Sequence, residues 1–334
     1  MQSPTTSTVA ALLSLFGVII AAYGISYWAF RARTDRSAFV GLYLLFGIPG
    51  VLLTIAGAAT LIRGERELGP ILLLTGLGLT LPLIPQVRQA LARVTPIDPA
   101  SPVDMTALSI VFGMCGFLGG PILGGPAAIE APPPESIPAI GYVELAAQGL
   151  AFFLVGYLSV GWPVSRFDQA AGMPRVRTFS EASQRLGIVV PDLRTIGWGI
   201  GATIASFVVA GVAGYIGTLV QPGVGEGVSE VVNAMTGAIQ TVPGALLLGI
   251  SAGVGEEAIF RGALQPRIGI VLTSIVFALV HGGQYGLNFS LVGLFLVSIV
   301  LGVTRQRCNT TAAMIAHALF NSLQVLALVA ATGG

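Results

Sequence analysis

The stretch GVGEEAIFRGALQP at residues 253–266 decides how this chain is interpreted, because it places Glu256, Glu257 and Arg261 inside an apolar run. Apolar residues make up 54% of the 334 residues, and Asp, Glu, Lys and Arg only 9%. A soluble globular domain carries roughly 25% charged residues. The composition therefore predicts an all-α, polytopic transmembrane helix bundle. Ionised residues are costly in a bilayer and are functional candidates by default, so these three direct the search for a site.

The apolar runs predict about ten membrane spans, with a range of about eight to ten, since a helix needs roughly 20 apolar residues to cross about 30 Å of hydrocarbon. The run at 68–85 contains Pro70, Pro82 and Pro85 and is a candidate for a broken span, and the run at 289–304 is short. The predicted spans are 8–30, 38–62, 68–85, 106–125, 141–162, 195–220, 243–263, 268–286, 289–304 and 310–331.

Composition also excludes several classes of function. The net charge of +1 and the scattered arginines provide no basic surface for nucleic acid. Cys115 and Cys308 lie far apart in apolar surroundings and cannot form a disulfide framework or a four-ligand metal site. The first apolar run follows a head without Lys or Arg and precedes RARTDR at 31–36, so we interpret it as a retained span rather than a signal peptide.

The distribution of arginines predicts a multi-pass protein of the cell membrane with its N-terminus outside, because basic residues favour cytoplasmic loops. The opposite loops, 126–139 and 221–240, contain no basic residue, while RGERE at 63–67 is an exception. In the longest cytoplasmic loop, 163–194, Ser180 is the expected N-cap of a short interfacial helix. The arginines that agree with this orientation are Arg31, Arg33, Arg36, Arg88, Arg93, Arg166, Arg175, Arg177, Arg185 and Arg194.

Helical spacing separates the roles of the two glutamates. Glu257 and Arg261 are four residues apart, with the acid first, which favours an ion pair on one helix face. Glu256 points in another direction and has no local partner. A carboxylate whose charge the surroundings disfavour suits a general base. We therefore predict Glu256 as the base and Glu257 as a structural carboxylate, with a purely structural clamp as the alternative.

The only two histidines, His281 and His317, also fall inside predicted spans. Phe277 shares a helix face with His281, and Asn321 shares one with His317. An imidazole and a carboxamide on one face can donate hydrogen bonds to an oxyanion. Glu256, His281 and His317 are also sufficient ligands for a catalytic zinc, but they lack the HExxH spacing on one helix. The residues alone leave both chemistries open.

Three motifs in order resemble a known family, the type II CAAX prenyl protease and bacteriocin-processing (CPBP or Abi) intramembrane proteases. The motifs are EExxxR, FxxxH and HxxxN, and this chain has EEAIFR at 256–261, FALVH at 277–281 and HALFN at 317–321. The resemblance is anchored over roughly 243–331. It implies three regions, namely an N-terminal transmembrane region of unknown role at 1–162, a cytoplasmic loop at 163–194 and a protease core at 195–334.

The resemblance implies an intramembrane endopeptidase that hydrolyses a peptide bond near the cytoplasmic membrane face. Glu256 would activate water with the help of His281, and His317 and Asn321 would stabilise the oxyanion. Glu257, Arg261 and Phe277 would shape the site.

No cofactor or metal is expected under this interpretation, and zinc held by Glu256, His281 and His317 is the alternative. The expected partners are the lipid bilayer and a peptide or membrane-protein substrate, whose prenylation is left open. A non-proteolytic scaffold or immunity protein of the same family is a second hypothesis, and a transporter is a third. We interpret Glu144 and Gln148, four residues apart in the span at 141–162, as helix-packing residues.

Overall fold

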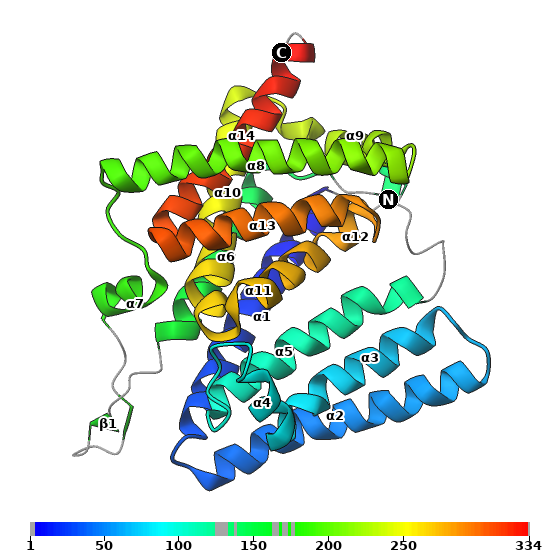
Figure 1. The fold of residues 1–334 in the computed structure, drawn as a ribbon, viewed down its shortest axis with the longest axis vertical. Coiled ribbons are helices and arrows are strands. Elements are labelled where there is room, and N and C mark those ends of the chain that lie inside the picture. The colour runs from blue at the N-terminus through cyan, green and yellow to red at the C-terminus, as the bar shows by residue number, and fades with distance from the viewer. Residues whose placement is uncertain are drawn as a thin grey trace.

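The chain forms a bundle of long helices, seen in Figure 1, as the composition predicts. The computed structural model describes residues 4–123, 133–136, 139–161, 167–168, 173–174 and 178–332. Within these residues the only strands are β1 (Phe167–Asp168) and β2 (Met173–Pro174), which pair antiparallel with Phe167 opposite Pro174. The predicted all-α class is therefore confirmed.

The N-terminal half supplies one set of packed helices. Here Gly78 lies against the backbone of Phe112 on the neighbouring helix, and Gly116 lies against Leu74 in return. Small residues let membrane helices approach this closely. The elements are α1 (Pro4–Arg31), α2 (Arg36–Ile62), α3 (Leu68–Thr80), η1 (Leu81–Leu83), α4 (Pro85–Leu91), α5 (Pro102–Gly119), η2 (Gly120–Leu123), η4 (Pro134–Ser136) and α6 (Tyr142–Gly161).

The predicted span at 68–85 is broken, as its prolines indicate. The helix of Leu68–Leu83 and the short helix Pro85–Leu91 are bent by 89° relative to each other. Proline lacks the backbone N–H and clashes with the preceding helical turn. Pro82 and Pro85 therefore lie at the place where the helix changes direction.

The C-terminal half contains the three motifs. Its elements are α7 (Phe179–Leu186), α8 (Leu193–Val220), α9 (Val224–Thr236), η5 (Gly237–Ile239), α10 (Val242–Glu257), the π-helical η6 (Ala258–Leu264), α11 (Gln265–Val280), α12 (Gly282–Tyr285), α13 (Ser290–Arg307) and α14 (Thr310–Thr332). The segment at 221–240, expected as a connecting loop, thus contains the helix α9.

Eight helices of the described residues are long and apolar enough to cross a membrane, or nine if the bent pair is one span. One of them is a continuous stretch of 44 residues, Val242–Tyr285. A straight helix of that length would extend about 66 Å, twice the hydrocarbon thickness. Gly269, at φ 82° and ψ 171°, breaks its helical backbone. This kink lies at the second residue of the predicted span 268–286, shortly after the end of the predicted span 243–263.

The short helix predicted in the loop at 163–194 is present as α7, but Ser180 is not its N-cap. Thr178 occupies that position, and its hydroxyl accepts a hydrogen bond from the Glu181 N–H at 3.3 Å. The Glu181 carboxylate accepts one from the Thr178 N–H at 2.8 Å, which completes a capping box. The prediction began the helix too late because Ser180 and Thr178 are both good caps. Arg166, Arg175 and Arg177 lie outside the described residues.

The start of α8 lies beside the end of α13 and the end of α7. Arg194, at the start of α8, donates to the carbonyl of Arg307 at 3.3 Å, and the Thr310 N–H donates to the Gly187 carbonyl at 2.9 Å. Figure 1 shows the same end of α8 and α13 beside α7, with α9 and α12 at the opposite end. The start of α8 therefore lies at the same end of the bundle as the end of α13, so these two helices run in opposite directions (Figure 1).

Candidate active site

The three motifs converge in the middle of the bundle. α10 carries Glu256 and Glu257, and the π-helix η6 that follows it carries Arg261. α10 packs on α14 and on α6. Close approach requires small residues here, since a Cβ at Gly253 would lie 2.7 Å from the Met314 carbonyl oxygen, and one at Gly149 would lie 2.8 Å from the Ser251 Cα. π-helical segments frequently occur at functional sites.

Glu257 is the centre of a buried network. Its Oε1 accepts hydrogen bonds from Arg261 Nη1 at 3.0 Å and from His317 Nδ1 at 2.7 Å, and both Glu257 and Arg261 are fully buried. The predicted ion pair is therefore present. His317, 5% exposed, is part of the same network. Because a carboxylate only accepts hydrogen bonds, Nδ1 of His317 carries a proton.

Arg261 is further held by the helices around it. Its Nη2 donates to the carbonyl oxygen of Ser298 at 3.2 Å and to the Ser298 hydroxyl at 2.9 Å. The guanidinium lies over the Phe277 ring, 4.8 Å from its centroid. Arg261 thus links η6 to α11 and α13 through these contacts, and it also neutralises the charge of Glu257. Both contributions agree with the site-shaping role predicted for Arg261.

Glu256 and His281 face each other across a gap. His281 Nε2 and Glu256 Oε2 are 3.9 Å apart, too far for a direct hydrogen bond and suitable for one bridging water. His281 Nδ1 lies 2.7 Å from the Phe277 carbonyl oxygen. That carbonyl can only accept, so Nδ1 carries the proton and Nε2 of the neutral ring presents a lone pair toward Glu256. Glu256 Oε2 is buried and has no hydrogen-bond partner in the described part of the chain.

The Phe277 ring packs between the two histidines. Its centroid lies 4.8 Å from that of His281 and 5.8 Å from that of His317. On the other side of His281, Tyr285 stacks nearly parallel with the imidazole at 6.2 Å. The imidazole of His281 is therefore fixed by two rings and a backbone carbonyl, as the pairing of Phe277 with His281 on one helix face predicts.

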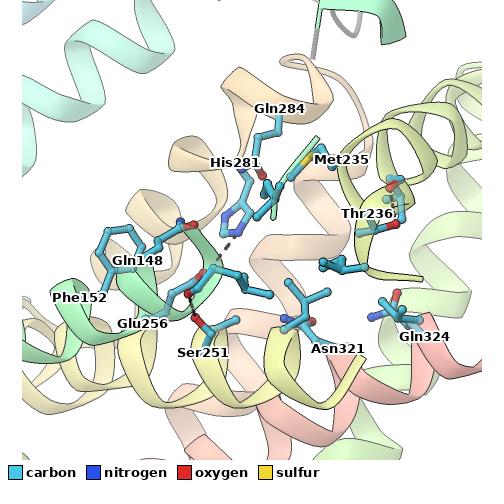
Figure 2. A pocket seen from close by; sticks show the side chains of 18 of the residues that line it. Gln148, Phe152, Met235, Thr236, Ser251, Glu256, His281, Gln284, Asn321 and Gln324 are labelled. Atoms are coloured by element: carbon cyan, nitrogen blue, oxygen red, sulfur yellow. Dashed lines mark hydrogen bonds and ion pairs between the residues drawn. The ribbon is translucent and has the colours of Figure 1, made fainter. Parts of the chain in front are cut away.

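A cavity of about 160 Å³ lies in front of Glu256, and we call it the polar pocket. Glu256, His281 and Asn321 line it, whereas His317 is not among its lining residues. Figure 2 shows Asn321 of α14 across the pocket from the Glu256–His281 pair. The cavity has room for several water molecules. The pocket therefore brings together three of the four predicted catalytic residues, and His317 lies behind them beside Glu257.

Several polar residues of the pocket escaped the sequence interpretation. Gln284 and Tyr285 follow His281 by three and four residues, so helical spacing could have found them. Gln148 of α6, predicted to be only a packing residue, lines the pocket from the region 1–162. The polar residues that had no predicted role in the site are Gln148, Thr236, Ser251, Gln284, Tyr285 and Gln324.

The three alternative zinc ligands Glu256, His281 and His317 do not converge on one point in this structure. Among the described residues, no group of three or more His, Cys, Asp and Glu side chains could hold one. Nδ1 of His317 is bound by Glu257, and Glu256 approaches only His281. Zinc therefore stays the alternative hypothesis, to be tested by chelation.

Comparison with protein families identifies the segment that carries this site. Residues 238–323 match a family model described as type II CAAX prenyl endopeptidase, Rce1-like. All three motifs lie inside the matched residues, so the match confirms the resemblance predicted from them. Searches of curated proteins and of solved structures found no match.

Proposed function

Starting from the similarity of residues 238–323 to type II CAAX endopeptidases, we propose that this membrane protein is an intramembrane endopeptidase with Glu256 as its general base. The observation that carries the proposal is the gap of 3.9 Å between Glu256 Oε2 and His281 Nε2 at the wall of the polar pocket. Both atoms are hydrogen-bond acceptors. A water between them donates one hydrogen bond to each atom and keeps a lone pair for attack.

In the proposed reaction, the water oxygen attacks the carbonyl carbon of the scissile peptide while Glu256 removes one of its protons. The resulting oxyanion accepts a hydrogen bond from the Asn321 carboxamide. His317 does not line the polar pocket and its Nδ1 is held by Glu257, so we place it behind the site as a positioning residue instead of the oxyanion donor predicted from the sequence. The C–N bond then breaks, and the carboxyl group of Glu256 returns its proton to the leaving amine. The products are one carboxylate and one amine.

The network around Glu257 supports this division of labour. Two adjacent carboxylates have different surroundings, since Glu257 is neutralised by Arg261 and bound to His317 while Glu256 has only the distant His281. Groups with such separated environments take different roles in acid–base catalysis. We therefore propose Glu257, Arg261 and Phe277 as positioning residues.

The reaction proposed here needs no metal or cofactor, and its partners are the bilayer and a peptide or membrane-protein substrate. We propose the cell membrane as its location, with the N-terminus outside, from the arginine pattern. The regions 1–162, 163–194 and 195–334 stay a prediction. α6 contributes Gln148 and Phe152 to the polar pocket, so the proposed site also uses residues outside 195–334.

Cleavage of membrane-tethered reporter peptides by purified protein in liposomes tests the proposal. Wild type, Glu256→Gln and Asp35→Asn, a control at a partly exposed helix cap outside the polar pocket, are compared with and without a strong chelator. The proposal expects cleavage by wild type and by the control, a loss of about 100-fold or more in Glu256→Gln, and no effect of the chelator. Abolition by the chelator with rescue by zinc would establish the metal alternative. Unchanged cleavage in Glu256→Gln would refute Glu256 as the base.

A further inference from the structure

A second cavity adjoins the polar pocket and has a different character. It has a volume of about 550 Å³ and lies between α1, α5, α6, α10 with η6, and α11. We call it the lateral cavity. Most of its lining is aliphatic or aromatic, for example Val18, Ala22, Ile110, Val155 and Ile259. Because these helices are membrane spans, the cavity lies at the depth of the hydrocarbon.

Glu256 and His281 stand at the boundary between the two cavities. Five residues line both the lateral cavity and the polar pocket, namely Gln148, Phe152, Glu256, His281 and Gln284. In Figure 2, Gln148 and Phe152 lie on one side of the Glu256–His281 pair, and Asn321 and Gln324 lie on the other. A molecule that passes through this boundary would meet the proposed base and continue into both cavities.

The lateral cavity is long and narrow. On α6 its lining runs from Gln148 to Ser159, which is about 17 Å at 1.5 Å per residue. Its far end reaches Arg267, which forms an ion pair with Asp104 of α5. About five residues of extended chain span that distance. An extended chain leaves its backbone carbonyls free for the proposed attack, whereas a helix engages them in its own hydrogen bonds.

The boundary residues favour a peptide over a lipid chain as the occupant. The side chains of Gln148 and Gln284 make no hydrogen bond to any described residue, and each carries two donors and an acceptor. An extended peptide at hydrocarbon depth has backbone N–H and C=O groups that must find partners. An acyl chain has none, so it would leave both carboxamides with only the water of the polar pocket as partners.

We propose that the lateral cavity binds about five extended, apolar residues of the substrate on one side of the scissile bond, while the polar pocket receives the residues on the other side. This inference rests on the proposed function. The substrate class is therefore a membrane-embedded segment that unwinds next to a polar sequence. Gln148 and Gln284 hold its backbone at the boundary.

The first helix becomes a specificity element under this inference. Val18, Ala22 and Ile25 lie on one face of α1 and form a wall of the lateral cavity. α1 lies outside the residues that match the protease family. The small side chain at Ala22 leaves space for a bulky substrate residue. Through α1, the N-terminal region therefore contributes to substrate specificity under this proposal.

Narrowing the lateral cavity tests its role in cleavage. Ala22→Phe is compared with Ala10→Phe, an exposed position on α1 outside the lining. Reporters carry five leucines or five alanines on either side of a common cleavage site. We expect Ala22→Phe to lower kcat/KM for one leucine reporter about tenfold or more, and to change the alanine reporters less than about twofold. Equal effects on all reporters, or none, would overturn the inference.

A binding experiment separates this inference from the proposed function. Glu256→Gln protein with Cys115→Ala and Cys308→Ala receives a single cysteine at Ala22 or at Ala10. A leucine reporter with one cysteine is added, and copper phenanthroline oxidises neighbouring thiols to a disulfide. We expect cross-linking at position 22, suppressed by excess cysteine-free reporter, and little at position 10. Equal cross-linking at both positions, or no competition, would overturn the binding of a peptide in the lateral cavity.

The cleavage and cross-linking experiments distinguish failure of the proposed function from failure of the lateral-cavity proposal. Specific cross-linking at position 22 by a protein whose wild type cleaves no reporter would refute the endopeptidase and leave the peptide-binding cavity intact. Cleavage that is Glu256-dependent but insensitive to Ala22→Phe, without cross-linking at position 22, would refute the lateral cavity alone.

Discussion

Removing Arg261 should destabilise the protein strongly, and removing Glu257 with it should restore most of that stability. In Arg261→Met the carboxylate of Glu257 stays fully buried with His317 as its remaining partner. Breaking a buried pair at one partner costs about 3–5 kcal/mol, because the other charge is left uncompensated. Arg261 also loses its bonds to Ser298, so we expect the upper part of that range.

The double variant Glu257→Gln/Arg261→Met removes both charges. The Gln carbonyl oxygen can still accept from His317 Nδ1, and Met fills an apolar position beside the Phe277 ring. Replacing a buried ion pair by neutral groups of similar volume is often neutral or stabilising. We therefore expect the double variant to lie within about 2 kcal/mol of wild type, although its catalytic activity should fall because His317 loses the carboxylate.

The free energy of unfolding is measured by titrating the detergent-solubilised protein with SDS and following tryptophan fluorescence. The exposed pair Arg31–Asp35, joined at 2.8 Å, supplies the control. Hydrogen bonds from the Ser37 hydroxyl and the Ala38 N–H lower the pKa of Asp35 to about 2, so it is ionised at neutral pH. Arg31→Met removes this pair but keeps the Asp35 helix cap, and it should leave the transition nearly unchanged. An Arg261→Met cost below about 1 kcal/mol, or a double variant that loses the sum of the single effects, would refute the reasoning.

Three further outcomes follow from the structure. Gly253→Val should lower the free energy of unfolding by about 1–3 kcal/mol, because its Cβ would lie 2.7 Å from the Met314 carbonyl oxygen. Gly211→Val in α8 is the control, since a side chain there meets open space. SDS titration measures both variants, and equal losses of stability would contradict the packing argument. Thr178→Ala should speed amide hydrogen exchange in α7, because it removes an N-cap worth about 1 kcal/mol, whereas Ser180→Ala should not. Faster exchange in Ser180→Ala than in Thr178→Ala would identify Ser180 as the N-cap. Asn321→Ala should lower kcat about 100-fold or more with a smaller change in KM, because it removes the proposed hydrogen-bond donor to the oxyanion. Cleavage of the reporter peptides measures both constants. A change in KM alone would assign Asn321 to substrate binding.

The sequence by itself determined the features that depend on neighbours along one helix. The spacing of four residues predicted the pairing of Glu257 with Arg261 and of Phe277 with His281, and both pairs are in contact. Apolar length predicted the spans, and the prolines of 68–85 indicated the break in that run. These features are local, because helix geometry alone sets which side chains share a face.

Only the tertiary structure decided which helix faces meet. It pairs His317 with Glu257 across 60 residues, and it brings Gln148 of α6 to the wall beside Glu256. It also places α1 along the lateral cavity. In a membrane, hydrophobicity does not determine which helix faces pack together, because the surrounding lipid is equally apolar. Close packing at small residues such as Gly149 and Gly253 determines the helix pairs instead. Glycines occur throughout this chain, so their spacing alone could not specify those contacts.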